Sequence, residues 1–595
     1  MKPFATSDCA KTLTEGLNRL FGSCEPWQVA TITATTVLST IWFWSVVNQD
    51  ESNTRVIKFF RQLRKLPIVQ RQIDEELSKA NKDFEGEIIK SCANLTYTLE
   101  LPHNGISKEE IIALVDEHLA ISHYNWRDGR VSGAVYGFKE DIVELITSVY
   151  GKASYTNPLH PDIFPGICKM EAEVVRMSCT LFHGDAESCG TMTTGGTESI
   201  LMACKAYRDF ARETKGITVP NMVVPKTAHA AFDKAGQYFN IHVRYVNVDP
   251  VTMEVDIKAL KRAINKNSIL LVGSAPNFPY GTMDDIEEIA ALGIKYNIPV
   301  HVDACLGSFL VAMLTEAGYS VKPFDFAVKG VTSISADTHK YGFAPKGSSL
   351  ILYSEKKYRN HQFTVTTDWP GGVYGSPTVN GSRAGGIIAA CWATMMSYGH
   401  DGYLEATKRI VDTARYVEQG VRKVKGIYIF GKPATSVIAI GSKVFDVFRL
   451  SDALCKAGWN LNTLQFPSGI HICITDLHTA PGIADKFLAD LQAAVAEIMK
   501  DPGQPVEGKM AIYGVAQGIP DRTIVGEVAR CFLNIKFSGT GATKQLLQTL
   551  KKHHEYSKDY KIYKHTIATH PKSLHVIINI LNKQDKVKKK QQQSS

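Results

Sequence analysis

The stretch Ile298-Pro-Val-His-Val-Asp303 is a short apolar run that ends in a carboxylate. Similar runs alternate with helix-like segments from about Lys108 to Lys356, a pattern typical of an α/β fold with a mainly parallel sheet. Further strands are predicted at 222–224, 269–273 and 328–335. Ligands of such sheets bind outside the carboxyl ends of the strands, so we expect Asp303 to face a crevice.

Beyond about His400 the pattern changes to helix, strand and helix again, which predicts a second, smaller C-terminal α/β domain. Its predicted strands lie at 428–430, 437–440 and 470–474. The predicted organisation is a lumenal N-terminus (1–26), a transmembrane helix (27–47), a juxtamembrane segment (48–107), a large domain (108–399), the small domain (400–535) and a basic tail (536–595).

The segment from Trp27 to Val47 carries no charged side chain. At about 1.5 Å per residue it is long enough to cross a hydrocarbon layer of roughly 30 Å. A cleaved signal peptide or a buried helix explains it less well, because the run exceeds an ordinary signal core and no small-residue cleavage site follows. Cations are denser after the run than before it, so we expect one span with the N-terminus lumenal and the body cytosolic.

The composition predicts a folded globular protein. Hydrophobic residues make up 44% and charged residues 21% of the 595-residue chain, and 67 Lys and Arg against 59 Asp and Glu give a net charge of +8. This excess is too mild and too dispersed for nucleic-acid binding, so we expect no such partner. The 12 cysteines form no C-x-x-C pair, which indicates reduced thiols, and we expect no metal site.

Two further features point to chemistry in the crevice. Gly195 and Gly196 lie at a predicted strand-to-helix turn, where backbone amides can bind a phosphate, although such a pair is more often only a turn. Asp303 alone would equally suit a helix cap. Lys340, however, follows another predicted strand, and a lysine is rarely placed deep in a crevice unless it is paired or functional. Such a lysine can form a Schiff base.

Four motifs in this order resemble the fold-type-I pyridoxal-phosphate enzymes of the decarboxylase-like group. The motifs are Gly195-Gly-Thr-Glu-Ser199, Ala228-His-Ala-Ala-Phe-Asp-Lys234, His301-Val-Asp-Ala304 and Asp337-Thr-His-Lys340. Within that group the chain is similar to the sphingosine-1-phosphate lyase family, on the N-terminal anchor and on Asn157-Pro-Leu-His-Pro-Asp-Ile-Phe-Pro-Gly166, Gly381-Ser-Arg383 and Ala511-Ile-Tyr-Gly514.

The resemblance implies a pyridoxal 5'-phosphate site with named roles. Lys340 would bind the cofactor as a Schiff base, Asp303 would pair with the pyridine nitrogen, and His229 would stack on the ring. The cofactor phosphate would be bound by Gly196, Thr197, His339 and, from a second subunit, Ser382. An active site shared in this way implies a homodimer.

The substrate would be a phosphorylated long-chain base. The residues that the resemblance supplies for its phosphate are Lys346, Tyr136, His160 and Tyr513. By residue type alone, such a lysine is more often a surface charge and such a tyrosine more often packing. Cys305 is expected to line the site, although a small buried apolar residue would be equally compatible.

The implied reaction is cleavage of the C2–C3 bond to a fatty aldehyde and phosphoethanolamine, in the endoplasmic reticulum membrane. The catalytic base stays open between Lys340, a histidine and a phosphate oxygen. The cofactor motifs alone suit an amino-acid decarboxylase equally well. A catalytically dead membrane scaffold is a third possibility, disfavoured by the intact Asp303 and Lys340.

Overall fold

The computed structural model describes residues 100–122, 124–506 and 522–537, with isolated positions between 25 and 98. Two compact units divide the chain, one comprising residues up to 121 with those from 518 onward, the other residues 122–517. The predicted span at 27–47 lies outside the described residues. Among those described, no helix is both long and apolar enough to cross a bilayer.

In the first unit the structure describes helices α5 (Lys108–Leu119) and α18 (Arg522–Phe537). Ser107 caps α5, since its Oγ accepts a hydrogen bond from Glu110 N at 3.2 Å while the Glu110 carboxylate accepts one from Ser107 N at 2.9 Å. The residues of α18 up to 535, which the sequence analysis assigns to the small domain, fall in this unit.

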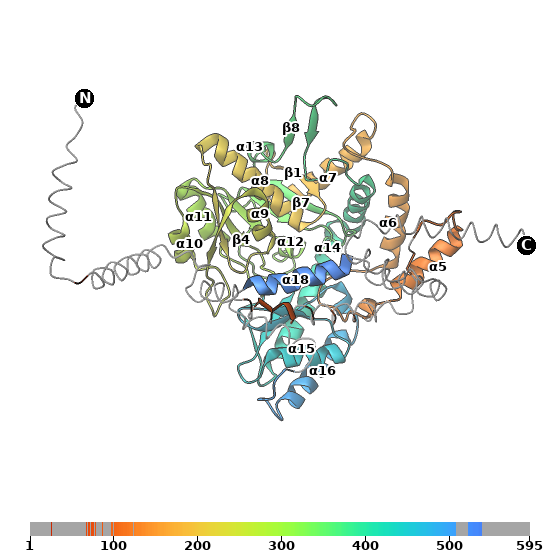
Figure 1. Cartoon of the computed structure of the whole chain (residues 1–595), viewed down its shortest axis with the longest axis vertical. Helices are drawn as coiled ribbons and strands as arrows, with labels where there is room; N and C mark the ends of the chain where they lie inside the picture. The colour runs from red at the N-terminus through yellow and green to blue at the C-terminus, as the bar shows by residue number, and fades with distance from the viewer. Residues whose placement is uncertain are drawn as a thin grey trace, which may run out of the picture. The chain divides into compact units, whose positions relative to one another are not determined.

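A seven-stranded sheet with strand order β1-β7-β6-β5-β4-β2-β3 is the centre of the second unit. Figure 1 labels its strands β1, β4 and β7. Strands β2 to β6 run parallel to one another, and β7 pairs antiparallel with β6 and β1, which confirms the mainly parallel sheet. The strands are β1 (Cys189–Thr193), β2 (Asn221–Pro225), β3 (His242–Val246), β4 (Ser268–Ser274), β5 (Val300–Asp303), β6 (Ser333–Ala336) and β7 (Ser349–Tyr353).

Three of the predicted strands of this sheet are confirmed as β2, β4 and β5. The strand predicted at 328–335 is wrong in its first half, because residues 328–330 form a turn and only Ser333–Ala336 pairs with β5. Apolar side chains there signal burial under the sheet, and burial alone does not require extended backbone.

Side chains alternate between the two faces of the sheet, as the pleat requires. Met222 and Val224 of β2 pack in the same cluster as α8 and α9, whereas Val223 packs in the cluster that holds α7, α11 and α14. The α-helices described between residues 122 and 422 are α6 (Glu140–Ala153), α7 (Pro165–Leu181), α8 (Gly196–Lys215), α9 (Ala231–Phe239), α10 (Ile257–Ala263), α11 (Ile286–Tyr296), α12 (Ser308–Val311), α13 (Lys356–Asn360) and α14 (Gly385–Arg422).

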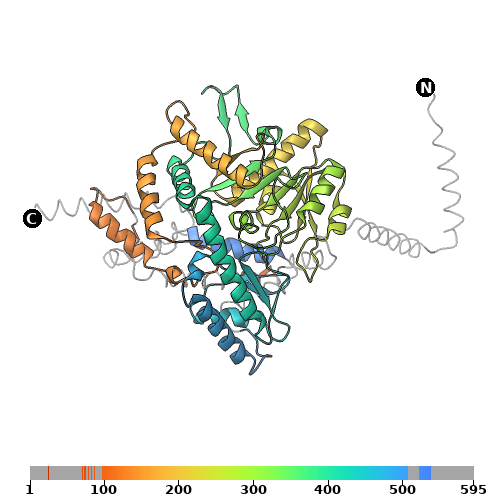
Figure 2. The same ribbon diagram turned by 180° about the vertical axis from the view of Figure 1, so that it is seen from behind.

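A smaller antiparallel sheet of order β10-β11-β13-β12 follows, with α15 (Val447–Lys456) and α16 (Ile483–Ile498), as Figure 2 shows below the large sheet. Its strands are β10 (Tyr428–Ile429), β11 (Val437–Gly441), β12 (Asn462–Leu464) and β13 (Gly469–Cys473). Helix α14 crosses the predicted boundary at 399/400 and is broken there at Gly399, where φ is 58°. A separate hairpin joins β8 (Thr364–Thr366) and β9 (Tyr374–Ser376).

Candidate active site

The glycine turn lies where β1 ends and α8 begins. Gly196 is the first residue of α8, a 20-residue helix whose first amides have no partner within the helix. A Cβ at Gly196 would lie 2.7 Å from Cys305 Sγ and 2.8 Å from Asp337 Oδ1, so only glycine fits. The helix N-terminus therefore approaches the ends of β5 and β6 more closely than a side chain would allow.

Glu198 links this turn by hydrogen bonds to the loop that contains Val379. One of its oxygens, Oε2, accepts hydrogen bonds from Thr194 N at 2.7 Å and from Thr194 Oγ1 at 2.6 Å, while Oε1 accepts one from Val379 N at 3.0 Å. The carboxylate is buried, so these bonds supply its solvation. Val379 and Asn380 are thereby held at the edge of the glycine turn.

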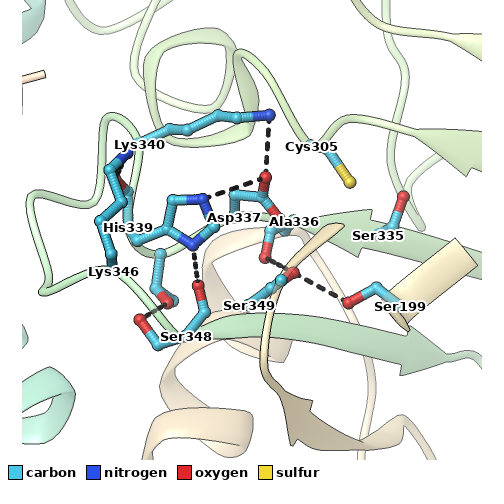
Figure 3. Close-up of polar contacts among 12 residues, drawn as sticks. Ser199, Cys305, Ser335, Ala336, Asp337, His339, Lys340, Lys346, Ser348 and Ser349 are labelled. Atoms are coloured by element: carbon cyan, nitrogen blue, oxygen red, sulfur yellow. Dashed lines mark hydrogen bonds and ion pairs between the residues drawn. The ribbon is translucent and has the colours of Figure 1, made fainter. Parts of the chain in front are cut away.

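Lys340, which is partly buried, forms an ion pair with the buried Asp337 at the carboxyl end of β6 (Figure 3). Its Nζ lies 2.8 Å from Oδ2 of Asp337, and the same oxygen lies 3.7 Å from Nε2 of His339. His339 donates its Nδ1–H to the Ser348 carbonyl. Asp337 is 2% exposed and, within the described part of the chain, its Oδ1 has no hydrogen-bond partner, so the Lys340 ammonium is the main group that solvates the carboxylate.

The ion pair governs the protonation of this cluster. Burial by itself lowers the pKa of Lys340, but the adjacent Asp337 carboxylate outweighs it and leaves the pKa raised. Burial likewise raises the pKa of Asp337, and the Lys340 ammonium outweighs it and leaves the pKa lowered. Burial lowers the pKa of His339, against the opposing pull of Asp337. The structure thus holds a charged lysine beside a charged aspartate and a neutral histidine.

These groups line a cavity of about 590 Å³ at the carboxyl edge of the sheet. It brings together six of the predicted site residues, namely Gly196, Thr197, His229, Cys305, His339 and Lys340. His229 is exposed to the cavity, and its Nδ1 accepts a hydrogen bond from Ala231 N at 3.1 Å, so a proton on the neutral ring lies on Nε2.

Asp303 ends β5 beside this cavity, as predicted, but it is 7% exposed and does not line the cavity. Its Oδ1 accepts hydrogen bonds from Cys305 N at 3.1 Å and from Ser335 Oγ at 3.3 Å. Within the described part of the chain, Oδ2 accepts none, which leaves one carboxylate oxygen available to a ligand.

The remaining predicted site residues lie elsewhere. Lys346 donates to the His339 carbonyl at 3.3 Å, and its Nζ lies 4.9 Å from the ring centroid of the buried Tyr136. Ser382 lines a neighbouring cavity of about 190 Å³, which shares Thr194, Glu198 and Asn380 with the larger one. His160 is exposed in the turn before α7 and does not line the cavity of Lys340. Tyr513 lies outside the described residues.

The sequence analysis assigned no role to Asp337 or Asn380, yet both line the cavity. For Asp337 a signal was present. It follows a strand directly and lies three residues before Lys340, a spacing at which one turn of chain brings the two side chains together. For Asn380 there was none: it directly precedes the Gly381-Ser-Arg383 motif, but the sequence does not place that segment at the glycine turn. The hydrogen bond from Val379 N to Glu198 holds it there.

The residues present fit pyridoxal phosphate. The site offers a lysine amine, unpaired amides at the start of α8 with His339 beside them, and a free acceptor oxygen on Asp303 for a protonated ring nitrogen. Gly196 has no Cβ, and this keeps the phosphate side of the cavity open. Among the described residues, no group of three His, Cys, Asp or Glu side chains could hold a metal ion.

Comparison with known proteins agrees with this chemistry. Residues 96–441 match the pyridoxal-dependent decarboxylase conserved domain. A sphingosine-1-phosphate lyase of Drosophila melanogaster is 75% identical over 90% of this chain and 98% of its own length.

Solved structures show the same fold. A sphingosine-1-phosphate lyase of Burkholderia pseudomallei is 40% identical, with a TM-score of 0.66 over 68% of this chain and 94% of the other. A glutamate decarboxylase of Lactobacillus brevis shares the fold alone, at 21% identity and a TM-score of 0.59 over 70% of this chain and 97% of its own. The chain therefore belongs to the pyridoxal-dependent decarboxylase family and, within it, to the sphingosine-1-phosphate lyases.

Proposed function

We propose that the protein is a pyridoxal-phosphate-dependent lyase that cleaves the C2–C3 bond of sphingosine 1-phosphate and related phosphorylated long-chain bases. The products are a long-chain fatty aldehyde and phosphoethanolamine. The observation that carries the proposal is Lys340, paired with Asp337 in a cavity that the N-terminus of α8 opens onto. The sphingosine-1-phosphate lyases that the chain resembles support the choice of substrate.

Bound pyridoxal phosphate supplies an aldehyde that condenses with an amine and a ring that accepts the electron pair released when the C2–C3 bond breaks. Lys340 would hold it covalently, and the α8 amides at Gly196 and Thr197, with His339, would bind its phosphate. Asp303 would offer Oδ2 to the ring nitrogen. His229 would cover one face of the ring.

The substrate's own phosphate needs cations that the cofactor does not use. Lys346 is our candidate, because its Nζ lies 3.3 Å from the His339 carbonyl oxygen and 4.9 Å from the centroid of the Tyr136 ring, which brings a cation and a phenol together. His160 and Tyr513 stay proposals for the same phosphate.

Cleavage also needs a base for the C3 hydroxyl proton. The basic side chains lining the cavity that could take it are His229, Lys234, His339 and Lys340.

An amino-acid decarboxylase is the second candidate, because the same cofactor residues would serve it. The product separates the two. Carbon dioxide from an amino acid would indicate decarboxylation, and a fatty aldehyde from a phosphorylated long-chain base would indicate the lyase. The identity to sphingosine-1-phosphate lyases, against fold-level likeness to a glutamate decarboxylase, favours the lyase.

The cellular setting is part of the proposal. We propose a single-pass protein of the endoplasmic reticulum membrane, anchored by residues 27–47 with the N-terminus lumenal, so that a cytosolic site meets a lipid substrate at the bilayer surface. We also propose a homodimer in which Ser382 reaches the partner's site. Ser382 borders a cavity next to that of Lys340 and does not enter it, which supports this arrangement.

Replacement of Lys340 tests the proposal. We expect Lys340→Ala to lose cofactor absorbance and to lose fatty-aldehyde production from sphingosine 1-phosphate, measured by mass spectrometry. Lys322→Ala is the control, since Lys322 lies at the surface between Glu254 and Asp285 and should keep full activity. Aldehyde release at the wild-type rate by Lys340→Ala would exclude Lys340 as the cofactor lysine.

A further inference from the structure

Behind Asp303 lies a chain of hydrogen bonds that no step of the proposed reaction uses. Ser335 Oγ lies 3.3 Å from Asp303 Oδ1 and 3.1 Å from His301 Nε2. The other ring nitrogen of His301, Nδ1, lies 2.8 Å from Ser333 Oγ. The hydrogen bonds connect the side chains in the order Ser333, His301, Ser335, Asp303.

The sheet register builds this chain of bonds. On the parallel strands β5 and β6, His301 is paired with Ser333 and Asp303 with Ser335. Side chains two residues apart on a strand point to the same face, so all four side chains lie on one face of two neighbouring strands. We call this series of hydrogen bonds from Ser333 to Asp303 the relay. Because its side chains lie on two adjacent interior strands, it is held as rigidly as the centre of the sheet.

Counting protons gives the relay a direction. A serine hydroxyl carries one proton, and Ser335 gives its proton to the Asp303 carboxylate, which can only accept. Ser335 must therefore accept the Nε2–H of His301. Nδ1 of a neutral His301 then accepts, and Ser333 donates to it. Every bond points toward Asp303.

Burial keeps this direction fixed. His301, Ser333 and Ser335 have no exposed surface, and the ring of Phe232 packs edge-on against His301 at 6.0 Å. Burial lowers the pKa of His301 to about 4, with the charge of Asp303 opposing it, so the ring stays neutral near pH 7. A neutral ring with one N–H is what the directed relay requires.

We propose that His301 and Ser335 are positioning residues that fix the Asp303 carboxylate, with Oδ1 occupied from behind and Oδ2 presented to the ring nitrogen of the cofactor. This inference rests on the proposed pairing of Asp303 with that nitrogen.

The test compares two ligands of the purified apoprotein, pyridoxal phosphate and its 1-deaza analogue, in which a carbon replaces the ring nitrogen. Binding is measured by absorbance and fluorescence titration, so no turnover is needed. The preference for the natural cofactor over the analogue reports the contact of Asp303 with the nitrogen. We expect Ser335→Ala to shrink this preference by roughly three- to tenfold, as loss of one hydrogen bond to a charged group would.

Four further variants refine the test. Ser335→Thr keeps the hydroxyl and should restore the preference. His301→Gln, whose amide can donate in place of Nε2, should retain more of it than His301→Leu. Ser274→Ala is the matched control, because Ser274 is paired with Asp303 on the adjacent strand, is buried, and has a hydroxyl with no hydrogen-bond partner among the described residues. It should leave the preference unchanged.

Asp303→Asn separates failure of the relay from failure of the proposed pairing. If Asp303→Asn removes the preference while Ser335→Ala does not change it, the relay is overturned and the pairing stands. If Ser335→Ala weakens both ligands equally, Ser335 has only a structural role and the inference is wrong. If Asp303→Asn leaves the preference intact, Asp303 does not contact the nitrogen. That result would contradict both the proposed pairing and the positioning role of the relay.

Discussion

At the scale of single residues, Asp337 determines the protonation state of Lys340. Its carboxylate lies 2.8 Å from Lys340 Nζ in a site where either charge alone would be costly. The ion pair therefore keeps Lys340 as an ammonium until a ligand displaces Asp337 or a proton acceptor removes the proton. A Schiff base requires the neutral amine, so loading of the site has to include loss of this proton.

Asp337→Asn should lower the pKa of Lys340, because the opposing burial then acts alone. The pH at which Lys340 is half-labelled by an amine-reactive reagent, followed by peptide mass spectrometry in the apoprotein, should fall well below the wild-type value. Labelling of Lys322, which is paired with Glu254 and Asp285, should keep its own pH dependence and provides the control within one sample. An unchanged labelling profile of Lys340 would contradict a role for Asp337 as its counter-ion.

Lys346 gives a second prediction at this scale. Burial, and then repulsion from Lys340, lower the pKa of Lys346 to about 8. Its positive charge is present below that pH and is lost as the pH rises through it, so affinity for a phosphorylated substrate should weaken above pH 8. We expect KM to rise there in the wild type and to rise less in Lys346→Arg, which stays charged. Parallel KM–pH profiles of the two proteins would exclude Lys346 from phosphate binding.

At the scale of elements, the start of α8 is set by close contact. Gly196→Ala would place a methyl group against Cys305 Sγ and the Asp337 carboxylate, which belong to the ends of two different strands. We expect a loss of about 1–3 kcal/mol in the free energy of unfolding and weaker cofactor binding, measured by urea denaturation and by cofactor titration.

Gly151→Ala is the matched control for that substitution. Gly151 lies in α6, and nothing lies within 4 Å of the Cβ that alanine would add. This change should stabilise the protein by about 0.5–1 kcal/mol, because alanine favours a helix interior. Equal stability of Gly196→Ala and the wild type would mean that the turn has room for a side chain.

At the scale of the whole molecule, buried ionisable groups govern stability in acid. Burial lowers the pKa of His301, His471 and His478 to about 4, below the value near 6.5 of an exposed histidine. The unfolded chain therefore binds more protons than the folded one between these pH values, and stability falls as the pH falls through this window. Asp284, whose pKa burial raises to about 6, acts in the opposite direction, as do Glu171 and Asp233, whose pKa values burial also raises. Asp337 and His339, whose pKa values are lowered, act in the same direction as the three histidines.

We therefore expect the urea midpoint to drop between pH 7.5 and pH 5. His471→Gln should reduce the drop, because His471 has an unpartnered Nε2 and its Nδ1–H donates to the Pro279 carbonyl, a bond that an amide can replace. A midpoint that does not change with pH would show that these histidines are charged or hydrated in the folded state.

The sequence by itself determined the chemistry and the type of fold. Alternating apolar runs predict the parallel strands β2, β4 and β5, because a strand buried on both faces needs apolar side chains whatever surrounds it. The order of the motifs resembles the family, and that resemblance supplies the proposed cofactor roles of Lys340, Asp303, His229 and the glycine turn.

Only the tertiary structure decided which groups act together. The contact of Asp337 with Lys340, the register that aligns His301 and Asp303 with Ser333 and Ser335, and the loop held by Glu198 all join segments through space. Local patterns record burial and turn chemistry but not strand order or pairing register. The packing of the whole sheet fixes strand order and register. It thereby decides that the Asp337 carboxylate faces Lys340 and that Asp303 accepts hydrogen bonds on Oδ1 and keeps Oδ2 for a ligand.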